Sequence, residues 1–422
     1  MEDILKGRII RKRKHGDVIF LDLRNKNGVE QLALRKSYFG DDYESFKDKI
    51  HIGDIVEVSG DYFTSNTGTN TLGIHTYDVL TQCHSPSKIK TRPNIDTRRN
   101  NRGFDLLTSQ ESLERFNKIG KLTSVLRMYL YEQGFIEMDT GILRNTTDTS
   151  KARDFTTIAN WNKQELYIRK STEQKLKQLM VGGLEDIFEL GKVFRNEDVG
   201  KEFSPEFTAL ELYKTFGVYE DLLDLMKGML KRIDNEIGIP RTKPSEFEEI
   251  GFYDYINGEI GMDSRVIKLE ELNDKIPFNK RKNYPMDEES RGYFLHDLFE
   301  SLIQEERDRN ITIIGYPKEI TVLSKRFEND PSLSEEFRMF VRGGSYCYGC
   351  TELIDYEEQK KRIEEQTKFW GKNEKKLDDN FIEMLKIGLP PCAGLGLSLE
   401  RLQAVYLDLD DVRDVIAFPL KK

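Results

Sequence analysis

The hydrophobic pattern of this 422-residue sequence changes period once, and the change divides the chain into two parts that must fold differently. Up to about residue 85, short β-rich runs alternate with turn residues. From Ser112 onward, apolar residues recur every three and four positions, which is typical of an amphipathic helix. The sequence therefore predicts a small β domain followed by a larger body that contains helices.

The first part, residues 1–85, is expected to form a small β-barrel. Its β-rich runs at residues 18–23, 31–34 and 55–58 are bounded by glycine-containing turns, and a polar helix fits at residues 43–50. Five strands and one helix within roughly 80 residues suit an OB-fold barrel. An SH3-like barrel would give a similar pattern, so both topologies stay open at this point.

Residues 86–111 are expected to form a basic linker between the two parts. Within residues 86–102, Asp96 is the single acidic residue. The basic residues are Lys88, Lys90, Arg92, Arg98, Arg99 and Arg102. Such a segment is either a solvated linker or a segment that faces the phosphates of a nucleic acid, and the sequence leaves both interpretations open.

The second part, residues 112–422, mixes helices and strands at irregular intervals. Apolar residues repeat with the helical period over residues 113–130 and 219–233. Strands are expected at residues 166–168, 187–194, 311–314, 340–341 and 394–397. This irregular order predicts an α+β sheet rather than a regular βαβ array.

Composition excludes several classes of protein. With 37% hydrophobic residues the chain is expected to be globular rather than disordered. No apolar run reaches the roughly 18 residues that a membrane span needs. Four cysteines are too few for a disulfide framework in a chain of this length, so a cytoplasmic location is expected. The net charge of −9 does not exclude a nucleic-acid partner, because local clusters decide that interaction.

The densest cluster of chemically active side chains lies between residues 193 and 213. Arg195 and Glu197 are two residues apart, so on one strand they would point to the same face. Four further residues could converge there across a hairpin: Glu206, Phe207, Glu211 and Tyr213. Such groups together suit a phosphorylated aromatic ligand and an amine-bearing one. A purely structural strand with salt bridges is the alternative.

A second cluster, residues 388–401, contains small residues that would let a ligand approach a strand closely, and Arg401 follows where a helix begins. This cluster lacks the Gly-Lys-Ser/Thr of a phosphate-binding loop. Cys347 and Cys350 have a C-x-x-C spacing, but residues three apart on a strand face opposite sides. We therefore expect no metal site at these cysteines.

Three segments, in the expected order, resemble motifs 1, 2 and 3 of the class II aminoacyl-tRNA synthetases. They are the periodic helix that ends at Gly134-Phe-Ile-Glu, the run Phe194-Arg-Asn-Glu and the run Gly394-Leu-Gly-Leu-Ser-Leu-Glu-Arg. Within this class the chain resembles the lysyl-tRNA synthetases. Aspartyl- and asparaginyl-tRNA synthetases share the architecture, but Asp105-Leu-Leu and Gly388-Leu-Pro-Pro-Cys-Ala-Gly favour the lysine branch.

The resemblance covers nearly the whole chain and implies an N-terminal OB-fold domain that binds the tRNA anticodon. It also implies a catalytic domain built on an antiparallel sheet, and a homodimer joined through the motif 1 helix. By position, Phe20 and Gln31 match family residues that stack on and hydrogen-bond anticodon bases. Phe20 could instead be a barrel-core aromatic residue, and a Glu of the family's last barrel turn is replaced at about Thr71.

Four residues fall where the family holds the amino groups of lysine: Glu173, Glu211, Tyr213 and Glu352. Three carboxylates and a phenol around ammonium groups would form charge-assisted hydrogen bonds that shorter neutral amino acids leave unsatisfied. The alternative, that these acids are simply surface residues, does not explain why all four align. Lysine or a close amine analogue is therefore the expected substrate.

For ATP, the resemblance assigns Arg195 to the α-phosphate and Arg401 to the γ-phosphate. It assigns Glu197 to a contact with the adenine and Phe207 to stacking on it. The implied reaction is attack of the lysine carboxylate on the α-phosphate, which gives lysyl-adenylate and pyrophosphate. Such chemistry depends on positioning and positive charge, so Arg195 and Arg401 are the expected catalytic residues.

The chain departs from the family where magnesium is bound. The two Glu positions that hold Mg²⁺ on ATP carry Arg338 and Ser345 here, and a nearby Asn position carries Tyr348. In the motif 2 loop, Glu202 and Phe203 remove two phosphate contacts. Because Mg²⁺ is usually held by one or two carboxylates plus phosphates, the loss of both should disfavour the metal. Arg338 could itself neutralise phosphate.

Three functions follow as hypotheses. The first is a ligase that forms lysyl-adenylate and transfers lysine to tRNA in protein biosynthesis. The second is a paralogue that transfers lysine to an acceptor other than tRNA, and the third is a catalytically impaired protein that binds lysine or tRNA. Retained Arg195, Glu197 and Arg401 favour catalysis, whereas Arg338 and Ser345 favour its loss.

Overall fold

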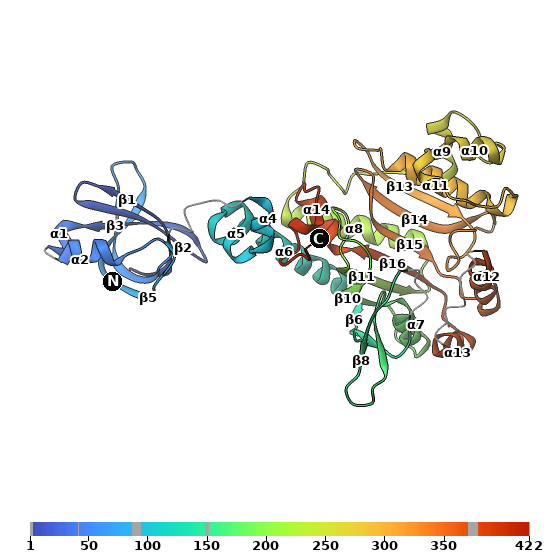
Figure 1. The fold of residues 1–422 in the computed structure, drawn as a ribbon, viewed down its shortest axis with the longest axis horizontal. Coiled ribbons are helices and arrows are strands. Elements are labelled where there is room, and N and C mark those ends of the chain that lie inside the picture. The colour runs from blue at the N-terminus through green and yellow to red at the C-terminus, as the bar shows by residue number, and fades with distance from the viewer. Residues whose placement is uncertain (1–2, 41, 87–93, 148–151, 370–378, 422) are drawn as a thin grey trace. The chain divides into compact units, whose positions relative to one another are not determined.

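The computed structural model describes residues 3–40, 42–86, 94–147, 152–369 and 379–421 (Figure 1). The chain forms two compact units, Met1–Leu113 and Glu114–Lys422. Among the described residues, no helix combines the length and the apolar character that crossing a membrane requires.

The first unit begins with a closed barrel of five strands in the order β1-β2-β3-β5-β4. The strands are β1 (Asp3–His15), β2 (Val18–Asn25), β3 (Gly28–Arg35), β4 (Ile55–Thr64) and β5 (Asn70–Thr81). β3 and β5 pair in parallel, and the other neighbours pair antiparallel. Helices α1 (Lys36–Phe39) and α2 (Asp42–Lys49) come between β3 and β4 in the chain. This is the OB-fold, so the prediction is confirmed and the SH3-like alternative is set aside.

Successive side chains of β2 alternate between the barrel core and the outside of the barrel. Ile19, Leu21 and Leu23 are buried in its core. Phe20, between them, is only half-buried and faces outward, with its ring edge-on to His15 at a centroid distance of 6.2 Å. Phe20 is therefore not part of the barrel core.

The segment expected to be a basic linker is helical over its second half. Helices α4 (Ile95–Asn100) and α5 (Arg102–Thr108) each begin with an asparagine side chain that caps the first turn. Arg102 is buried and pairs with Asp105 at 2.7 Å, so this basic residue stabilises α5 rather than facing solvent. Of the basic residues in this segment, Lys88, Lys90 and Arg92 lie outside the described ranges.

The second unit is built on an eight-stranded sheet with the order β12-β13-β14-β15-β16-β11-β10-β6. The strands are β6 (Ile136–Glu137), β10 (Ile187–Phe194), β11 (Glu206–Thr215), β12 (Glu248–Gly251), β13 (Asn310–Pro317), β14 (Leu333–Val341), β15 (Gly344–Thr351) and β16 (Cys392–Ser398). The pairs from β13 to β10 are antiparallel, and the edge strands β12 and β6 pair in parallel. The sheet is thus mixed, and the α+β class is confirmed.

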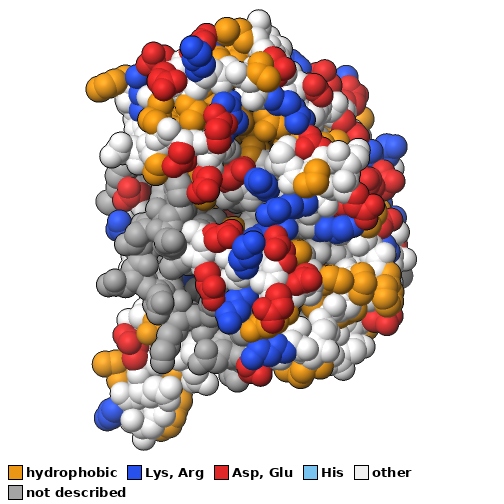
Figure 2. Space-filling view, turned by 90° about the vertical axis from the view of Figure 1, so that its right-hand side faces the viewer, with side chains coloured by type: hydrophobic (Ala, Val, Ile, Leu, Met, Phe, Trp, Pro, Cys, Tyr) orange, Lys and Arg blue, Asp and Glu red, His pale blue; other side chains and the backbone are white. Residues whose placement is uncertain are grey.

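Smaller elements accompany this sheet. A three-stranded sheet contains β7 (Leu143–Arg144), β9 (Glu165–Ile168) and β8 (Phe155–Ile158). Further helices are α7 (Glu173–Val181), α12 (Tyr356–Phe369) and α13 (Asp379–Ile387), with 3₁₀ turns at Phe278–Lys280, Glu288–Ser290 and Val412–Asp414. Figure 2 shows acidic and basic side chains interspersed on one face of the molecule.

Helices cover the large sheet in two groups. One hydrophobic core joins it to α6 (Gln110–Glu132), α8 (Tyr219–Ile237) and α14 (Leu399–Tyr406). A second core joins β13 to α9 (Phe252–Ile260), α10 (Leu269–Lys275) and α11 (Arg291–Ile303), drawn in yellow and orange in Figure 1. The helical periods predicted at residues 113–130 and 219–233 correspond to α6 and α8.

Candidate active site

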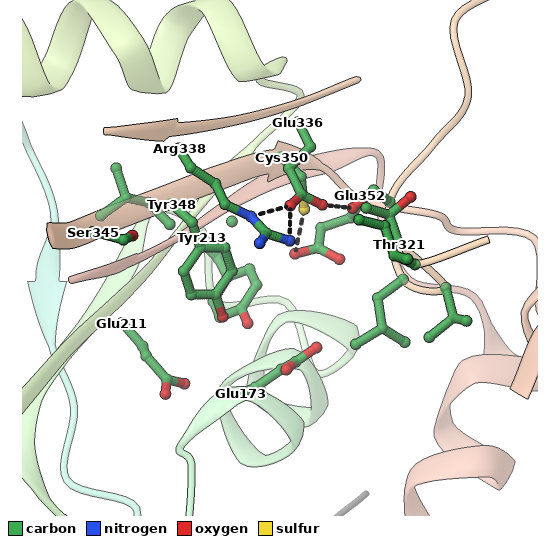
Figure 3. A pocket seen from close by; sticks show the side chains of 16 residues that line it. Glu173, Glu211, Tyr213, Thr321, Glu336, Arg338, Ser345, Tyr348, Cys350 and Glu352 are labelled. Atoms are coloured by element: carbon green, nitrogen blue, oxygen red, sulfur yellow. Dashed lines mark hydrogen bonds and ion pairs between the residues drawn. The ribbon is translucent and has the colours of Figure 1, made fainter. Parts of the chain in front are cut away.

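The face of β11, β15 and β16 that points away from α8 borders a pocket of about 350 Å³ (Figure 3). Glu173 at the start of α7, Glu211 and Tyr213 on β11, and Glu352 just after β15 all line it. The structure thus brings the four predicted lysine-binding residues into one cavity. Further lining residues include Glu336, Arg338, Ser345, Tyr348 and Cys350.

Alternation along β11 separates core residues from pocket residues. Its leucines pack into the core against α8, whereas Glu211 and Tyr213 point into the pocket. Tyr213 lies opposite Gly394 of β16. A Cβ atom at Gly394 would lie 2.3 Å from Oε1 of Glu352 and 2.5 Å from Cε1 of Tyr213. Only glycine therefore leaves room for both side chains.

A buried cation that sequence analysis missed, Lys177, lies among these carboxylates. Its ammonium nitrogen is 2.7 Å from Oε1 of Glu173 and 2.7 Å from Oε2 of Glu352, and 5.5 Å from the centre of the Tyr213 ring. Burial disfavours the ammonium ion, but the two carboxylates outweigh burial and hold the pKa of Lys177 well above its usual value. The only sequence signal was its spacing of four residues from Glu173 on one helix.

Glu211 has no cationic partner among the residues that the structure describes. Its Oε2 accepts hydrogen bonds from Oγ1 of Thr172 at 2.9 Å, the Thr172 amide at 3.1 Å and Oγ of Ser171 at 3.2 Å. Burial, followed by the charge of Glu173, raises the pKa of Glu211 to about 7. Burial also raises the pKa of Glu352 above its usual value.

The pocket contains more negative than positive groups. Its glutamates are Glu173, Glu211, Glu336 and Glu352. The cations that pair with them are Lys177 and Arg338. When all six groups are ionised, two negative charges stay uncompensated. A ligand with two ammonium groups would balance them, because buried charges are stable only when paired.

Two arginines near this pocket have no carboxylate partner among the described residues. Arg195 has a buried Nε without a hydrogen-bond partner, and its guanidinium carbon lies 5.2 Å from the centre of the Phe207 ring. Arg401 donates from Nη1 to the carbonyl of Ser345 at 2.5 Å and from Nε to the carbonyl of Glu202 at 3.0 Å. Burial lowers the pKa of Arg401; the charge of Glu202 opposes this effect, and the charge of Arg195 adds to it. Both arginines are suited to receive an anion.

Glu197 does not lie where the sequence placed it. Strand β10 ends at Phe194, so the prediction that Arg195 and Glu197 share one strand face is wrong. The chain turns just after this point, where the Glu197 amide donates to the carbonyl of Arg195 at 2.7 Å, and Glu197 is exposed. Phe207 does meet Arg195 across the hairpin.

The four predicted ATP-binding residues, Arg195, Glu197, Phe207 and Arg401, lie outside the lining of the 350 Å³ pocket. The connection between the two groups is Ser345, which lines the pocket and accepts the hydrogen bond from Arg401. The roles of these residues in ATP binding stay predictions.

Cys347 and Cys350 lie on opposite faces of β15. Cys347 belongs to the core against α8, whereas Cys350 lines the pocket with its Sγ 3.8 Å from Oε1 of Glu352. Burial raises the pKa of both thiols. The described part of the chain holds no group of three His, Cys, Asp or Glu side chains placed to bind a metal ion.

In the first unit, Phe20 and Gln31 lie on the neighbouring strands β2 and β3. Oε1 of Gln31 accepts a hydrogen bond from Oγ1 of Thr71 at 2.8 Å. Thr71, near which the resemblance places a family Glu, thus contacts the Gln31 side chain directly. Their contacts with anticodon bases stay predictions.

The antiparallel core of the sheet, the acidic pocket and the unpaired arginines together define the catalytic domain of a class II synthetase. The sequence profile of the family described as tRNA synthetases class II (D, K and N) matches residues 94–422. The profile described as OB-fold nucleic acid binding domain matches residues 4–79. The chain belongs to the class II tRNA synthetases (D, K and N), which confirms the resemblance seen in the motifs.

Among curated relatives, the similar proteins are named lysine--tRNA ligases. That of Staphylococcus saprophyticus is 33% identical over 98% of this chain and 86% of the relative. Lysine--tRNA ligase 2 of Methanosarcina mazei is 33% identical over 99% of this chain and 84% of the relative. That of Enterococcus faecalis is 32% identical over 98% of this chain and 86% of the relative.

Proposed function

We propose that this protein is a lysine-activating ligase of the lysyl-tRNA synthetase type. The carboxylate of lysine attacks the α-phosphorus of ATP, the bond to the β-phosphate breaks, and pyrophosphate leaves. Lysine then passes from the adenylate to a hydroxyl group of tRNA, and AMP is released. The names of the curated relatives and the OB-fold domain support lysine and tRNA as the substrates.

The observation that carries this proposal is the convergence of Glu173, Glu211, Tyr213 and Glu352 on one pocket with two uncompensated negative charges. Lysine brings two ammonium groups that can pair with these carboxylates, and with its own carboxylate it adds a net charge of +1 that offsets part of the deficit. A neutral or shorter amino acid would leave buried carboxylates without partners, and such unpaired groups lower affinity strongly. Arg195 and Arg401 supply positive charge for the phosphates, and Phe207 offers an aromatic face for the adenine.

Lysine-dependent exchange of pyrophosphate into ATP, followed by charging of tRNA with lysine, tests the proposal. Glu211→Gln should lower kcat/KM for lysine by about 10- to 100-fold, because it removes one charge-assisted partner of an ammonium group. Glu246→Gln, in an exposed ion pair with Lys243, is the matched control and should leave the rate unchanged. Exchange that does not depend on lysine would contradict the proposal.

The replacements Arg338 and Ser345 favour a second candidate, a protein that binds lysine or tRNA without forming the adenylate. Measurable lysine binding without pyrophosphate exchange would support it. Exchange without charging of any tRNA would instead support transfer of lysine to another acceptor.

The proposal includes a cytoplasmic homodimer joined through α6. Large apolar side chains on and beside this helix are exposed in the single chain: Met128 by 52%, Tyr131 by 53% and Ile136 by 48%. Burying such side chains against a second copy would stabilise a dimer. All four cysteines are free thiols, which suits a reducing compartment.

A further inference from the structure

Arg338 places a guanidinium group inside the acidic pocket (Figure 3). The side chain extends from β14 and is held on two sides. Nε donates to Oε1 of Glu336 at 2.9 Å, and Nη2 forms an ion pair with the same oxygen at 2.8 Å. The guanidinium carbon lies 4.3 Å from the centre of the Tyr316 ring. The group is therefore fixed before any ligand binds.

Part of this guanidinium group has no protein partner. Nη1 makes no hydrogen bond to the residues that the structure describes, although only 24% of the Arg338 side chain is exposed. The other oxygen of Glu336, Oε2, already accepts a hydrogen bond from Oγ of Ser324 at 2.8 Å. A charged donor that is fixed, mostly buried and open to a pocket is suited to bind an anion.

The residues present do not fit Mg²⁺. The family positions for this ion carry Arg338, whose guanidinium has donors but no acceptor, and Ser345, whose hydroxyl is neutral. The nearest carboxylate, Glu336, is occupied by Arg338 and Ser324. Magnesium in proteins needs carboxylate or phosphate oxygens around it, so this donor set disfavours the metal.

The neighbouring groups favour a phosphate over a carboxylate as the anion. Ser345 lines the same pocket as Arg338, and its carbonyl accepts a hydrogen bond from Arg401. Arg195 lies close enough to Arg401 for its charge to add to burial in lowering the pKa of Arg401. Arg338 and Arg401 are thus connected through Ser345, and Arg195 is a third guanidinium group near Arg401. A chain of phosphates carries enough negative charge for all three, whereas one carboxylate does not.

We propose that Arg338 binds the phosphate groups of ATP directly and, with Arg195 and Arg401, provides the positive charge for which the family uses Mg²⁺. This inference rests on the proposed function, because it takes ATP to be the nucleotide. It follows that the protein binds ATP in the absence of a divalent cation.

Calorimetric titration of the full-length protein with ATP tests this, once in EDTA and once in excess Mg²⁺. The expected affinities agree within about threefold, and Arg338→Met lowers both by at least about tenfold, the usual effect of losing a charged hydrogen bond. Wild-type binding that disappears in EDTA would overturn the inference. So would equal binding by Arg338→Met and the wild type.

Lysine binding, measured on the same samples, separates this inference from the proposed function. Arg338→Met should still bind lysine, because Glu173, Glu211 and Glu352 stay in the pocket, and this binding also shows that the variant folds. A loss of lysine affinity with ATP affinity intact would mean that Arg338 holds the amino-acid carboxylate, and it would overturn the inference. If the wild type bound lysine but no ATP, the inference about Arg338 would also be overturned. The proposed lysine-binding pocket would still be supported in that case.

Two further variants sharpen the test. Arg265 is also paired with a carboxylate, Asp330 at 2.9 Å, and lies over a tyrosine ring, Tyr253 at 3.9 Å, but outside the pocket. Arg265→Met is therefore the matched control and should bind ATP like the wild type. The double variant Arg338→Glu, Ser345→Glu restores two carboxylates, so its ATP binding should require Mg²⁺. ATP binding by this double variant that is equal in EDTA and Mg²⁺ would contradict the inference.

Discussion

The ammonium nitrogen of Lys177 lies 2.7 Å from Oε2 of Glu352, although the two residues are 175 positions apart in the sequence. The same nitrogen is 2.7 Å from Glu173, so one internal cation fixes two of the carboxylates that line the pocket. Lys177 therefore holds these side chains in place before lysine arrives. Glu211, which lacks such a partner, is the carboxylate most in need of a ligand cation.

Removal of Lys177 should destabilise the protein. In Lys177→Met two buried carboxylates lose their shared cation, and breaking a buried ion pair in this way typically costs about 3–5 kcal/mol. The loss in the free energy of unfolding should be larger at pH 8 than at pH 6. At pH 6 the abandoned carboxyl group of Glu352, whose pKa burial raises, can become protonated and neutral. Urea unfolding at both pH values measures this.

The matched control for this prediction is Lys121→Met. Lys121 makes an ion pair with Glu236 at 3.3 Å, but its side chain is 54% exposed. Surface pairs contribute at most about 1 kcal/mol, so this variant should unfold nearly like the wild type at both pH values. Equal losses for the two lysine variants would show that Lys177 has no special role in the pocket.

Lysine affinity should fall as the pH drops below 7. The pKa of Glu211 is about 7, so below this value the side chain becomes a neutral acid and no longer attracts an ammonium group. If one carboxylate must ionise, Kd rises by up to about tenfold per pH unit below 7. Calorimetric titration with lysine between pH 6 and pH 8 measures this, and Glu211→Gln should remove most of the dependence.

The raised pKa of Glu211 also makes the stability of the unliganded protein depend on pH. The pKa of Glu211 is about 7 in the folded state, above its usual value of 4.5. Between pH 4.5 and pH 7, Glu211 is therefore protonated in the folded state and ionised in the unfolded state. The contribution of Glu211 to stability therefore falls as pH rises from about 5 to 8. Lysine should reverse this loss by pairing with ionised Glu211. The rise in melting temperature that lysine causes should therefore be larger at pH 8 than at pH 6. A larger shift at pH 6 would contradict this assignment.

Phe20→Ala should weaken tRNA binding. Phe20 lies half-buried on the outside of the barrel, where its ring is available to stack on a base. Loss of one base stack costs about 1–3 kcal/mol, which corresponds to about 5- to 150-fold in affinity. Filter binding with tRNA measures the effect. Leu80→Ala, which removes another exposed apolar side chain from the same unit, should bind tRNA like the wild type.

Much of the fold followed from periodicity. The helical period predicted α6 and α8, because each buries one continuous apolar face. Short runs at residues 187–194, 311–314 and 394–397 predicted β10, β13 and β16. The resemblance to known motifs then placed Glu211 and Tyr213, which alternate with core leucines on β11. Local patterns of this kind are visible in the sequence.

What periodicity missed depends on distant partners or on short polar elements. Lys177 looks like one half of a surface pair on α7, and nothing nearby in the sequence reveals that Glu352 folds against it. Helices α4 and α5 have few apolar residues, and an asparagine cap begins each one. Just after β10 the chain turns through a backbone hydrogen bond from the Glu197 amide to the Arg195 carbonyl, which a pattern of side chains cannot show.

Met128→Asp should convert the proposed dimer to a monomer. Met128 on α6 is 52% exposed, and a carboxylate there would lie in the middle of an apolar interface without a partner. Sedimentation velocity should show a dimer for the wild type and mostly monomer for the variant. Met286→Asp changes a methionine of similar exposure, 50%, that lies away from α6. This variant should still sediment as a dimer. A wild-type monomer would contradict the proposed assembly.

Gly394→Ala should close the lysine pocket while leaving the sheet in place. The added methyl group would lie 2.3 Å from Oε1 of Glu352 and 2.5 Å from Cε1 of Tyr213, so both side chains must move. Lysine affinity should fall by at least about tenfold, and overpacking should cost about 1–3 kcal/mol of stability. Gly344→Ala on the neighbouring strand β15 is the control, because its nearest neighbour, the Val341 carbonyl, is 3.5 Å away. If Gly394→Ala bound lysine as tightly as Gly344→Ala, the amino acid would have to bind elsewhere.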